Sequence, residues 1–192
     1  MVAIAFFISG TGGNALNLAR ACSEGRVPGR PVVAVSSSGK APGNERLRAT
    51  GIPVQVLLRK DFDTEEAYSE ACLGAAEAAG AEVVCLCGWL KHLVIPQRWE
   101  GRILNIHPAL LPKHGGPGMY GMNVHRAVVA TGERESGCTI HVVDNLYDHG
   151  RILAQAKVPV GPEDTPEDVQ KRVYEQEMRL YPEALADFLA RR

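Results

Sequence analysis

The feature that most constrains the fold of this chain is an alternation, over its first half, of short apolar runs with segments that favour helix. Most of these runs are apolar throughout and too short for a buried helix, which is typical of strands whose two faces are both covered. Strands that alternate with helices in this way indicate a parallel sheet. The expected strands are residues 2–9, 31–36, 54–58, 83–87 and 103–107.

Helix signals lie between these runs. Asn14 follows the first strand and is expected to cap a helix. Residues 44–50 are expected to form a short helix that Gly51 closes. Asp63, with an acid three residues later, is expected to begin a third helix that ends near Ala79. Helices are therefore expected on both faces of the sheet.

The second half of the chain has a different pattern. Residues 136–143 and 152–160 are strand-like and only a short loop separates them, which indicates an antiparallel pair. Residues 114–122 are rich in glycine and are expected to form a loop before a short helix at 123–131. Thr165, followed by a proline and two acids, begins a final helix. The expected fold is α/β, a doubly wound, mainly parallel, Rossmann-like sheet with an antiparallel C-terminal strand pair.

Length and composition narrow the class of protein. A chain of 192 residues with 45% hydrophobic and 22% charged residues is expected to form one soluble domain over residues 1–192. The net charge of -1, without a basic stripe, argues against a nucleic-acid partner, and no apolar run has the length of a membrane span. The N-terminus lacks the basic leader of a signal peptide, and the five irregularly spaced cysteines predict neither disulfides nor a metal site. A cytoplasmic protein without a metal is expected.

A glycine-rich turn follows the first strand, with the sequence Ser-Gly-Thr-Gly-Gly-Asn over residues 9–14. Backbone N–H groups at such a turn, together with the N-terminus of the next helix, can bind a phosphate. The turn is neither a P-loop nor a GxGxxG motif, and the second strand does not end in the acid that a dinucleotide site needs. A phosphate-binding loop is one interpretation, and a tight turn without a ligand is the other.

Two polar residues interrupt the last apolar run of the first half. Asn105 and His107 are two residues apart, so both side chains point to the same face of the strand. Pro108 ends the strand directly after them, and the carboxyl ends of strands are where open parallel sheets bind ligands. On the residues alone, a buried asparagine beside a structural histidine explains the pattern equally well.

An amide, an imidazole and a carboxylate together suit acyl transfer. When an amine attacks a formyl carbon, amide and imidazole N–H groups stabilise the negative oxygen that forms. Histidine also exchanges protons near neutral pH, and a carboxylate assists it. Asp144 and Asp148 both lie in the loop after residues 136–143, and spacing does not choose between them. Neither zinc-ligand spacing nor a nucleophile elbow is present, which argues against metal-dependent hydrolysis and serine-esterase chemistry.

Taken together, these motifs resemble the phosphoribosylglycinamide formyltransferase family, the folate-dependent formyltransferases of purine synthesis. The Asn-x-His-Pro-x-Leu-Leu-Pro run and the downstream Asp-x-Gly are specific to the wider formyltransferase fold. The glycine loop and the chain length narrow the likeness to this family, and the likeness covers nearly the whole chain. The stretches that carry it are residues 8–14, 87–91, 103–112, 125–127, 137–141, 148–150 and 152–155.

The resemblance implies that a formyl group passes from the co-substrate 10-formyltetrahydrofolate to the amine of glycinamide ribonucleotide in de novo purine biosynthesis, without a metal. It implies a catalytic set of Asn105, His107 and Asp148, and so selects Asp148 over Asp144. A monomer or homodimer is expected, with these two small molecules as its partners. The implied binding residues are Gly12, Gly13, Asn14 and Glu177 for the phosphate and glycinamide of the substrate, and Leu90, Lys91, His92, Leu93 and Val143 for the folate.

The sequence also departs from the family pattern. Many members have Ser where Gly13 stands, so one side-chain contact to the phosphate is missing here. Residues 147–150 read Tyr-Asp-His-Gly instead of Leu-Asp-Gly-Gly, so the folate loop is expected to differ in shape. Residues 114–122 are longer than usual and form either a mobile lid or a longer surface loop. His141 alternates with apolar neighbours and is interpreted as structural.

Three other functions are compatible with parts of this pattern. A formyltetrahydrofolate hydrolase shares the Asn, His and Asp but has an N-terminal regulatory domain, which is not expected here. A tRNA formyltransferase has a C-terminal nucleic-acid-binding domain, which is also not expected. A non-catalytic nucleotide-binding module would use the glycine loop and would not need the three polar residues.

Overall fold

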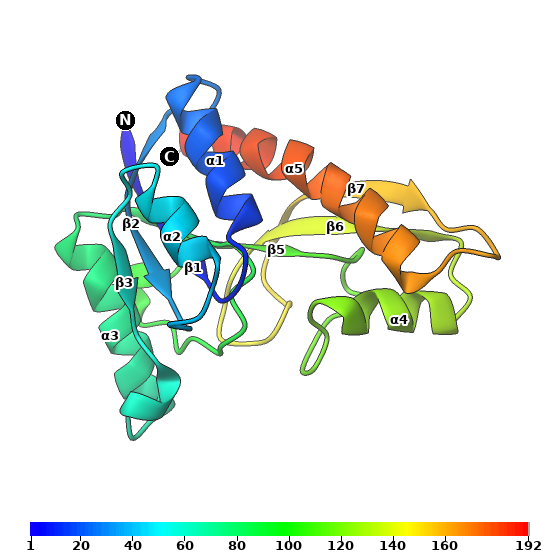
Figure 1. Cartoon of the computed structure of the whole chain (residues 1–192), viewed down its shortest axis with the longest axis horizontal. Helices are drawn as coiled ribbons and strands as arrows, with labels where there is room; N and C mark the ends of the chain where they lie inside the picture. The colour runs from blue at the N-terminus through cyan, green and yellow to red at the C-terminus, as the bar shows by residue number, and fades with distance from the viewer. Residues whose placement is uncertain (192) are drawn as a thin grey trace.

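The computed structural model describes residues 1–191, and one seven-stranded sheet forms its centre (Figure 1). The strand order is β3-β2-β1-β4-β5-β6-β7. Strands β1 to β5 run parallel to one another, whereas β6 pairs antiparallel with both β5 and β7. The predicted mainly parallel sheet with an antiparallel C-terminal pair is confirmed. The strands are β1 (Val2–Ile8), β2 (Gly29–Ser36), β3 (Val54–Val56), β4 (Val83–Leu86), β5 (Ile103–His107), β6 (Glu135–Val142) and β7 (Ile152–Pro159).

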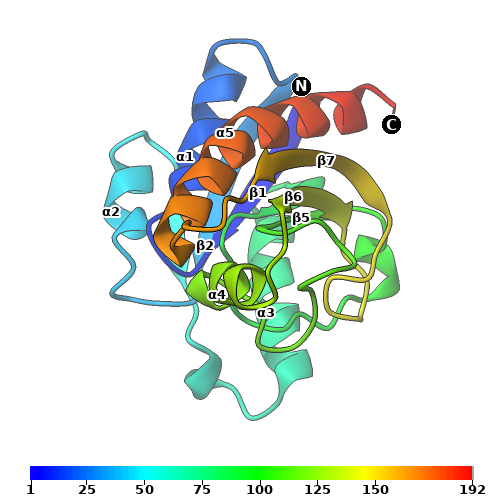
Figure 2. The same cartoon turned by 90° about the vertical axis from the view of Figure 1, so that its right-hand side faces the viewer.

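Helices cover both faces of this sheet, and Figure 2 shows α1 and α5 together on one side of it. Alternate residues of β1 belong to two separate apolar cores: Ile4 and Phe6 pack with α1 and α5, and Phe7 packs with Tyr68 of α3. Because both faces of β1 are buried, its sequence is a continuous apolar run. The helices are α1 (Gly13–Ser23), α2 (Gly43–Arg48), α3 (Glu65–Ala78), α4 (Met122–Ala130) and α5 (Pro166–Ala190), with short 3₁₀ turns at Arg59–Asp61 and Gln97–Trp99.

Two predicted helix starts are wrong. Gly12 is the N-cap that precedes α1. Its φ is 70°, a left-handed conformation that glycine adopts without strain. Asn14 therefore lies inside α1, and its side chain donates to Glu177 instead of capping the helix. Helix α3 begins after Thr64, whose hydroxyl accepts from Ala67 N at 3.1 Å, and not at Asp63.

Other element predictions hold with shifted ends. Strand β3 ends at Val56, earlier than predicted. The predicted start of α5 at Thr165 is confirmed, since the hydroxyl of Thr165 accepts from Asp168 N and the carboxylate of Asp168 accepts from Thr165 N. Helix α5 then runs without interruption through Pro182.

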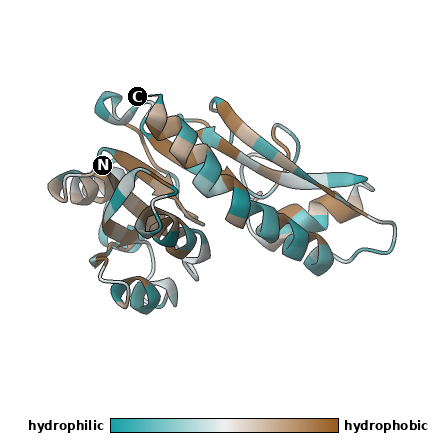
Figure 3. Cartoon of the chain, turned by 90° about the horizontal axis from the view of Figure 1, so that it is seen from above, coloured by the Kyte–Doolittle hydropathy of each residue, from teal (hydrophilic) through white to brown (hydrophobic). Residues whose placement is uncertain are grey.

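A buried tyrosine fixes α5 against the middle of the sheet. The hydroxyl of Tyr181 lies 3.2 Å from the carbonyl oxygens of both Leu86 and Leu104, so it joins α5 to β4 and β5. Figure 3 shows that α5 alternates between hydrophilic and hydrophobic residues along its length. Tyr181 thus holds α5 against two neighbouring strands in the middle of the sheet.

The strand order reverses between β1 and β4: β2 and β3 follow β1 on one side of this point, and β5, β6 and β7 follow β4 on the other side. In open α/β sheets, ligands bind in the crevice at the carboxyl ends of the strands at such a point. The glycine loop follows β1, residues 87–93 follow β4, and His107 ends β5, so all three meet at this edge. Within residues 1–191, no helix has the length and apolar character that a membrane span requires.

Candidate active site

A cavity of about 400 Å³ opens at this edge of the sheet. Its walls come from the glycine loop, the segments after β4 and β5, the loop between β6 and β7, and α5. The structure brings every site residue expected from the sequence into this one cavity. These are Gly12, Gly13, Asn14, Leu90, Lys91, His92, Leu93, Asn105, His107, Val143, Asp148 and Glu177.

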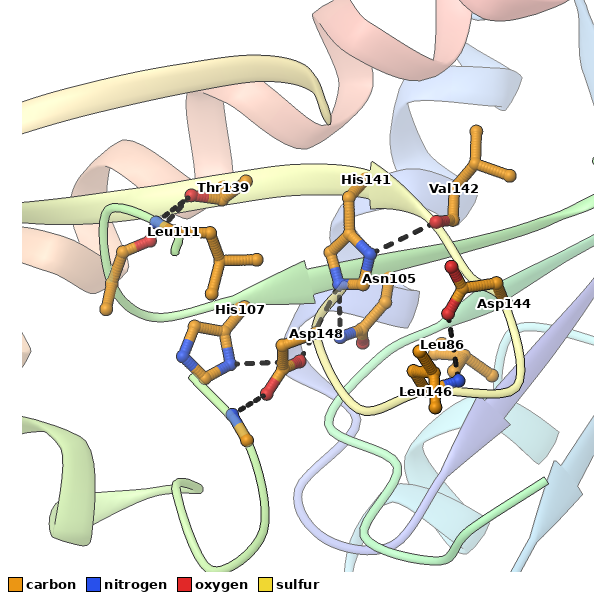
Figure 4. Close-up of polar contacts among 12 residues, drawn as sticks. Leu86, Asn105, His107, Leu111, Thr139, His141, Val142, Asp144, Leu146 and Asp148 are labelled. Carbon is orange, nitrogen blue, oxygen red and sulfur yellow. Dashed lines mark hydrogen bonds and ion pairs between the residues drawn. The ribbon is translucent and has the colours of Figure 1, made fainter. Parts of the chain in front are cut away.

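His107 and Asp148 form the polar centre of the cavity (Figure 4). His107 Nδ1 lies 3.4 Å from Asp148 Oδ1, and both side chains are largely buried. His107 Nε2 lies 2.8 Å from the carbonyl oxygen of His114. Both ring nitrogens therefore face acceptors, a geometry that the doubly protonated imidazolium satisfies. The pair places an imidazole ring and a carboxylate side by side at the end of β5.

Asn105 is held by a histidine on the neighbouring antiparallel strand. Asn105 and His141 are directly opposite each other in the register of β5 and β6, and Asn105 Nδ2 lies 3.1 Å from His141 Nε2. His141 Nδ1 lies 3.2 Å from the carbonyl oxygen of Val142, which can only accept, so Nδ1 carries the proton and Nε2 accepts from the amide. One amide hydrogen of Asn105 is used in this bond, and the other remains for the cavity.

Local backbone geometry presents Asp148 to both histidines. Asp148 has φ of 52° and His114 has φ of 53°, and these are the two residues other than glycine with positive φ within residues 1–191. Asp and His tolerate this region better than most residues, and such conformations gather at functional sites. Gly116 N donates to Asp148 Oδ2 at 3.0 Å. A Cβ on Gly150 would lie 1.8 Å from the carbonyl oxygen of Val142, so the Asp-x-Gly spacing is a steric requirement of this loop.

The structure separates the two aspartates that spacing left open. Burial by itself raises the pKa of Asp148, but hydrogen bonds, first among them the one from His107, outweigh burial and hold that pKa well below its usual range. Asp144 instead pairs with the exposed His149, whose Nδ1 lies 2.8 Å from its Oδ2, and accepts from Leu146 N. Asp148 is thus the carboxylate that contacts His107.

The other end of the cavity contains a buried acid. Asn14 Nδ2 donates to Glu177 Oε2 at 3.0 Å, which joins the first turn of α1 to α5. Glu177 is only 8% exposed, and this burial raises the pKa of its carboxyl to about 7. Nearby, Arg46 Nη1 donates to the carbonyl oxygen of Thr11 at 2.8 Å. The glycine loop is therefore bordered by an arginine on one side and by α5 on the other.

An apolar, exposed wall forms the third part of the cavity. Leu90 and Tyr147 are each about half exposed although both are large and apolar, and both line the cavity. The ring centroids of His92 and Tyr147 lie 5.0 Å apart, so the segment after β4 meets the loop between β6 and β7. Leu93 is buried and belongs mainly to the core under α3. This wall suits a flat, partly apolar ligand such as an aromatic heterocycle.

Sequence reasoning missed two histidines of the site. His141 was interpreted as structural, yet it contacts Asn105 and lies 3.7 Å from Asp148 Oδ1. Its position opposite Asn105 follows from strand pairing, which no local pattern encodes. His125 of α4 also lines the cavity, and burial followed by the nearby charge of His107 lowers its pKa to about 4. Within residues 1–191, no group of three or more His, Cys, Asp or Glu side chains is arranged to hold a metal ion.

The geometry defines a class of chemistry. An amide N–H, an imidazole ring and a carboxylate of lowered pKa stand together at one edge of a cavity, between a glycine loop and an apolar wall. Such a set stabilises an oxyanion and moves protons, which acyl transfer to an amine requires.

The comparisons with known proteins agree with this class. The model of the formyl transferase family matches residues 2–185, and the chain belongs to that family. Within it, the chain is similar to proteins named phosphoribosylglycinamide formyltransferase. It is 43% identical over 185 residues to the chloroplastic protein of Arabidopsis thaliana, covering 95% of this chain and 63% of that protein. It is 37% identical to the Haemophilus influenzae protein, covering 95% of this chain and 84% of that protein.

Solved structures show the same likeness. Glycinamide ribonucleotide transformylase 1 of Symbiobacterium toebii superposes with a TM-score of 0.94 at 36% identity, covering 100% of this chain and 89% of that chain. Phosphoribosylglycinamide formyltransferase of Brucella melitensis superposes with a TM-score of 0.87 at 40% identity, covering 98% of this chain and 96% of that chain. The α/β fold predicted from the sequence is therefore the formyltransferase fold.

Proposed function

We propose that this chain transfers the formyl group of 10-formyltetrahydrofolate to the amine of glycinamide ribonucleotide, a step of de novo purine biosynthesis. The observation that carries the proposal is the grouping of Asn105, His107 and Asp148 between a glycine loop and an apolar wall in one cavity. The names of the similar proteins support the choice of this substrate pair.

The proposed mechanism is direct attack by the amine on the formyl carbon. As the tetrahedral centre forms, the N–H of Asn105 that is not bonded to His141 donates to the new oxyanion. When it is protonated, the His107 ring, 3.4 Å from the Asp148 carboxylate, places positive charge beside the same oxygen. The proton that the amine loses passes through water and His107, which the Asp148 carboxylate orients, to the folate nitrogen as it leaves. In total, the formyl group moves from the folate nitrogen to the amine, and one proton moves from the amine to the folate nitrogen.

The proposed binding mode uses the two ends of the cavity. The phosphate lies at the N-terminus of α1, where Gly12, Gly13 and Asn14 offer backbone N–H groups, and Glu177 contacts the glycinamide. The folate lies against the apolar wall, which comprises Leu90, Lys91, His92, Leu93 and Val143 together with the exposed Tyr147.

The decisive experiment measures the release of tetrahydrofolate from 10-formyltetrahydrofolate, with and without glycinamide ribonucleotide. Release that depends on the ribonucleotide and yields the formylated product is the expected result. Release at the same rate with and without the ribonucleotide would identify a hydrolase on the same fold. No release in either case would overturn the enzymatic assignment in favour of a nucleotide-binding module.

We propose further that the protein works in the cytoplasm, as a monomer or a homodimer. All five cysteines are free thiols, and four of them are buried, as in proteins of reducing compartments. Size measurement in solution decides the oligomeric state.

A further inference from the structure

A short turn in the segment after β5, residues 114–116, holds both members of the catalytic pair. The carbonyl oxygen of His114 lies 2.8 Å from His107 Nε2, and the N–H of Gly116 donates to Asp148 Oδ2 at 3.0 Å. One end of the turn therefore supplies an acceptor to the imidazole, and the other end supplies a donor to the carboxylate. The position of this turn sets how the two catalytic groups face each other.

The turn has a conformation that its own residues do not favour. His114 has φ of 53°, in the left-handed region that costs a residue with a side chain free energy. The chain that follows is flexible by composition, since Gly116 and Gly118 also have positive φ and glycine accepts many other conformations. Contacts on the other side of the turn must therefore hold His114 in place.

Glu133 provides these contacts. Lys113 Nζ lies 3.0 and 3.1 Å from the two carboxylate oxygens of Glu133, and His114 Nε2 lies 3.6 Å from Oε1. A hydrogen bond from Lys113 lowers the pKa of Glu133, so this side chain is a carboxylate at neutral pH. The side chains of His114 and Glu133 are only 13% and 26% exposed, and partial burial strengthens a contact between charged or polar groups.

Glu133 itself belongs to the framework of the fold. It lies between the end of α4 and the start of β6, and its N–H donates to the carbonyl oxygen of Val128 in α4 at 3.3 Å. Strand β6 begins two residues later and pairs with β5, the strand that ends in His107. Glu133 does not line the cavity, so any effect it has on the reaction passes through the turn.

We propose that Glu133 is a positioning residue of the formyl transfer. Its carboxylate, by holding Lys113 and His114, fixes the turn of residues 114–116, and this turn holds the catalytic imidazole and carboxylate. The inference rests on the proposed function for the reaction that is affected. Because the geometry of catalytic groups acts on the reacting step more than on binding, the loss of Glu133 should change kcat and not KM.

The first test removes the carboxylate. We expect Glu133→Ala to lower kcat by roughly five- to twentyfold, less than the ~10²-fold that a misplacement of about 1 Å can cost. The KM for both substrates stays within about twofold. Glu133→Gln, which removes the charge but keeps the volume, should give a kcat between those of the wild type and Glu133→Ala. Glu135→Ala is the matched control with an unchanged kcat, because Glu135 pairs with the exposed Lys157 at 2.9 Å, away from the cavity.

The second test observes the hydrogen bond of His107 without any substrate. A carbonyl oxygen can only accept, so Nε2 of His107 carries a proton in the native geometry. In ¹⁵N-labelled protein this ring N–H is expected to give a signal that exchanges slowly with water. Exchange should be faster in Glu133→Ala and in Glu133→Gln, and should keep the wild-type rate in Glu135→Ala.

The third test asks whether Glu133 acts through His114. His114→Asn removes the ring that contacts Glu133, keeps the backbone carbonyl and places at position 114 a residue that tolerates positive φ. Because both changes break the same contact, the double variant of His114→Asn with Glu133→Ala should lose little more kcat than Glu133→Ala alone. Losses that multiply would show two independent effects and would overturn the inference.

The other contrary results are equally clear. The inference is overturned by a kcat of Glu133→Ala within twofold of wild type, by an equal loss in Glu135→Ala, or by an unchanged exchange rate of the His107 ring N–H. If Glu133→Ala does not fold, the kcat and exchange rate of Glu133→Gln decide in its place. Turnover of the wild type with glycinamide ribonucleotide tests the proposed function separately. A wild type without turnover would overturn that function, while the exchange measurement would still decide whether Glu133 holds the turn.

Discussion

At the scale of single residues, the catalytic assignment depends on the partner that holds Asn105. His141 orients the amide so that its NH₂ group, and not its oxygen, is shared between the neighbouring ring and the cavity. A donor fixed in this way needs no reorganisation when the oxyanion forms, which is why such groups contribute strongly to catalysis. The role of Asn105 is thus open to a direct test.

Asn105→Ala is expected to lower kcat by about 10²–10³, the cost of one oxyanion donor. The KM for both substrates changes little, because the donor acts mainly in the transition state. Steady-state kinetics and folate titration on the folded variant provide the measurement. A kcat within a few-fold of wild type would remove Asn105 from the mechanism.

The role of Asp148 in proton transfer is tested by comparing it with Asp144, the second aspartate of the loop between β6 and β7. Asp148→Asn is expected to lower kcat by about 10²–10⁴, the range of general acid–base catalysis, with folate binding retained. Asp144→Asn, which breaks only the exposed contact to His149, should leave kcat within a few-fold. If Asp144→Asn were the more damaging change, the assignment of Asp148 would be wrong.

Glu177 gives a prediction about pH and stability. Burial raises the pKa of its carboxyl from 4.5 to about 7 in the folded state, so the folded protein binds the proton more tightly than the unfolded chain. The stabilisation from the protonated Glu177 carboxyl is fully present below about pH 4.5 and is lost as pH rises through about 7, and it amounts to roughly 3 kcal/mol. Urea unfolding of wild type and Glu177→Gln across this window should show the wild type losing stability relative to the variant. If the unfolding free energies of the two proteins changed with pH in parallel, the raised pKa of Glu177 would be wrong.

At the scale of elements, the helix starts account for both a success and an error of sequence reasoning. Thr165 carries a full capping box, a local signal that the sequence displays, and α5 begins there. Asn14 has equally good capping chemistry, but its partner Glu177 comes from the far end of the chain, and Gly12 begins α1 instead. A local capping signal predicts the start of a helix correctly when no distant residue competes for the capping side chain.

The same distinction separates the predicted site residues from the missed ones. Asn105 and His107 interrupt an apolar strand, so their own sequence marks them. His141 becomes a site residue only through its register opposite Asn105, and His125 only through the position of α4 beside the cavity. Both positions depend on the packing of segments that lie far apart in the sequence, which no local pattern encodes.

The capping box of α5 leads to a prediction on stability without an effect on catalysis. Thr165→Ala removes the hydroxyl that accepts from Asp168 N and is expected to cost about 1 kcal/mol of unfolding free energy. Thr131→Ala is the matched control, because its hydroxyl only adds a bond to a helical carbonyl at the end of α4. Urea unfolding measures both variants, and equal losses would argue against a special role of the cap.

At the scale of the whole molecule, the site is shared between the two parts of the sheet. The parallel part supplies the glycine loop, Asn105 and His107, whereas the antiparallel part and α5 supply His141, Asp148 and Glu177. Neither part contains the catalytic set alone. A ligand that bridges the cavity therefore holds both parts in their native arrangement.

This sharing predicts that ligand binding stabilises the entire fold against unfolding. At a free ribonucleotide concentration of about 100 times its Kd, the unfolding free energy is expected to rise by about 2.7 kcal/mol. In a protein of this size, that corresponds to an increase in Tm of roughly 5–11 °C. Thermal unfolding with the ribonucleotide, with its dephosphorylated riboside and without ligand provides the measurement, with one cooperative transition expected in all three. Two separate transitions, of which the ligand shifts only one, would show that one part binds the ribonucleotide without the other, and the contact assigned here to Glu177 of α5 would then have no part in binding.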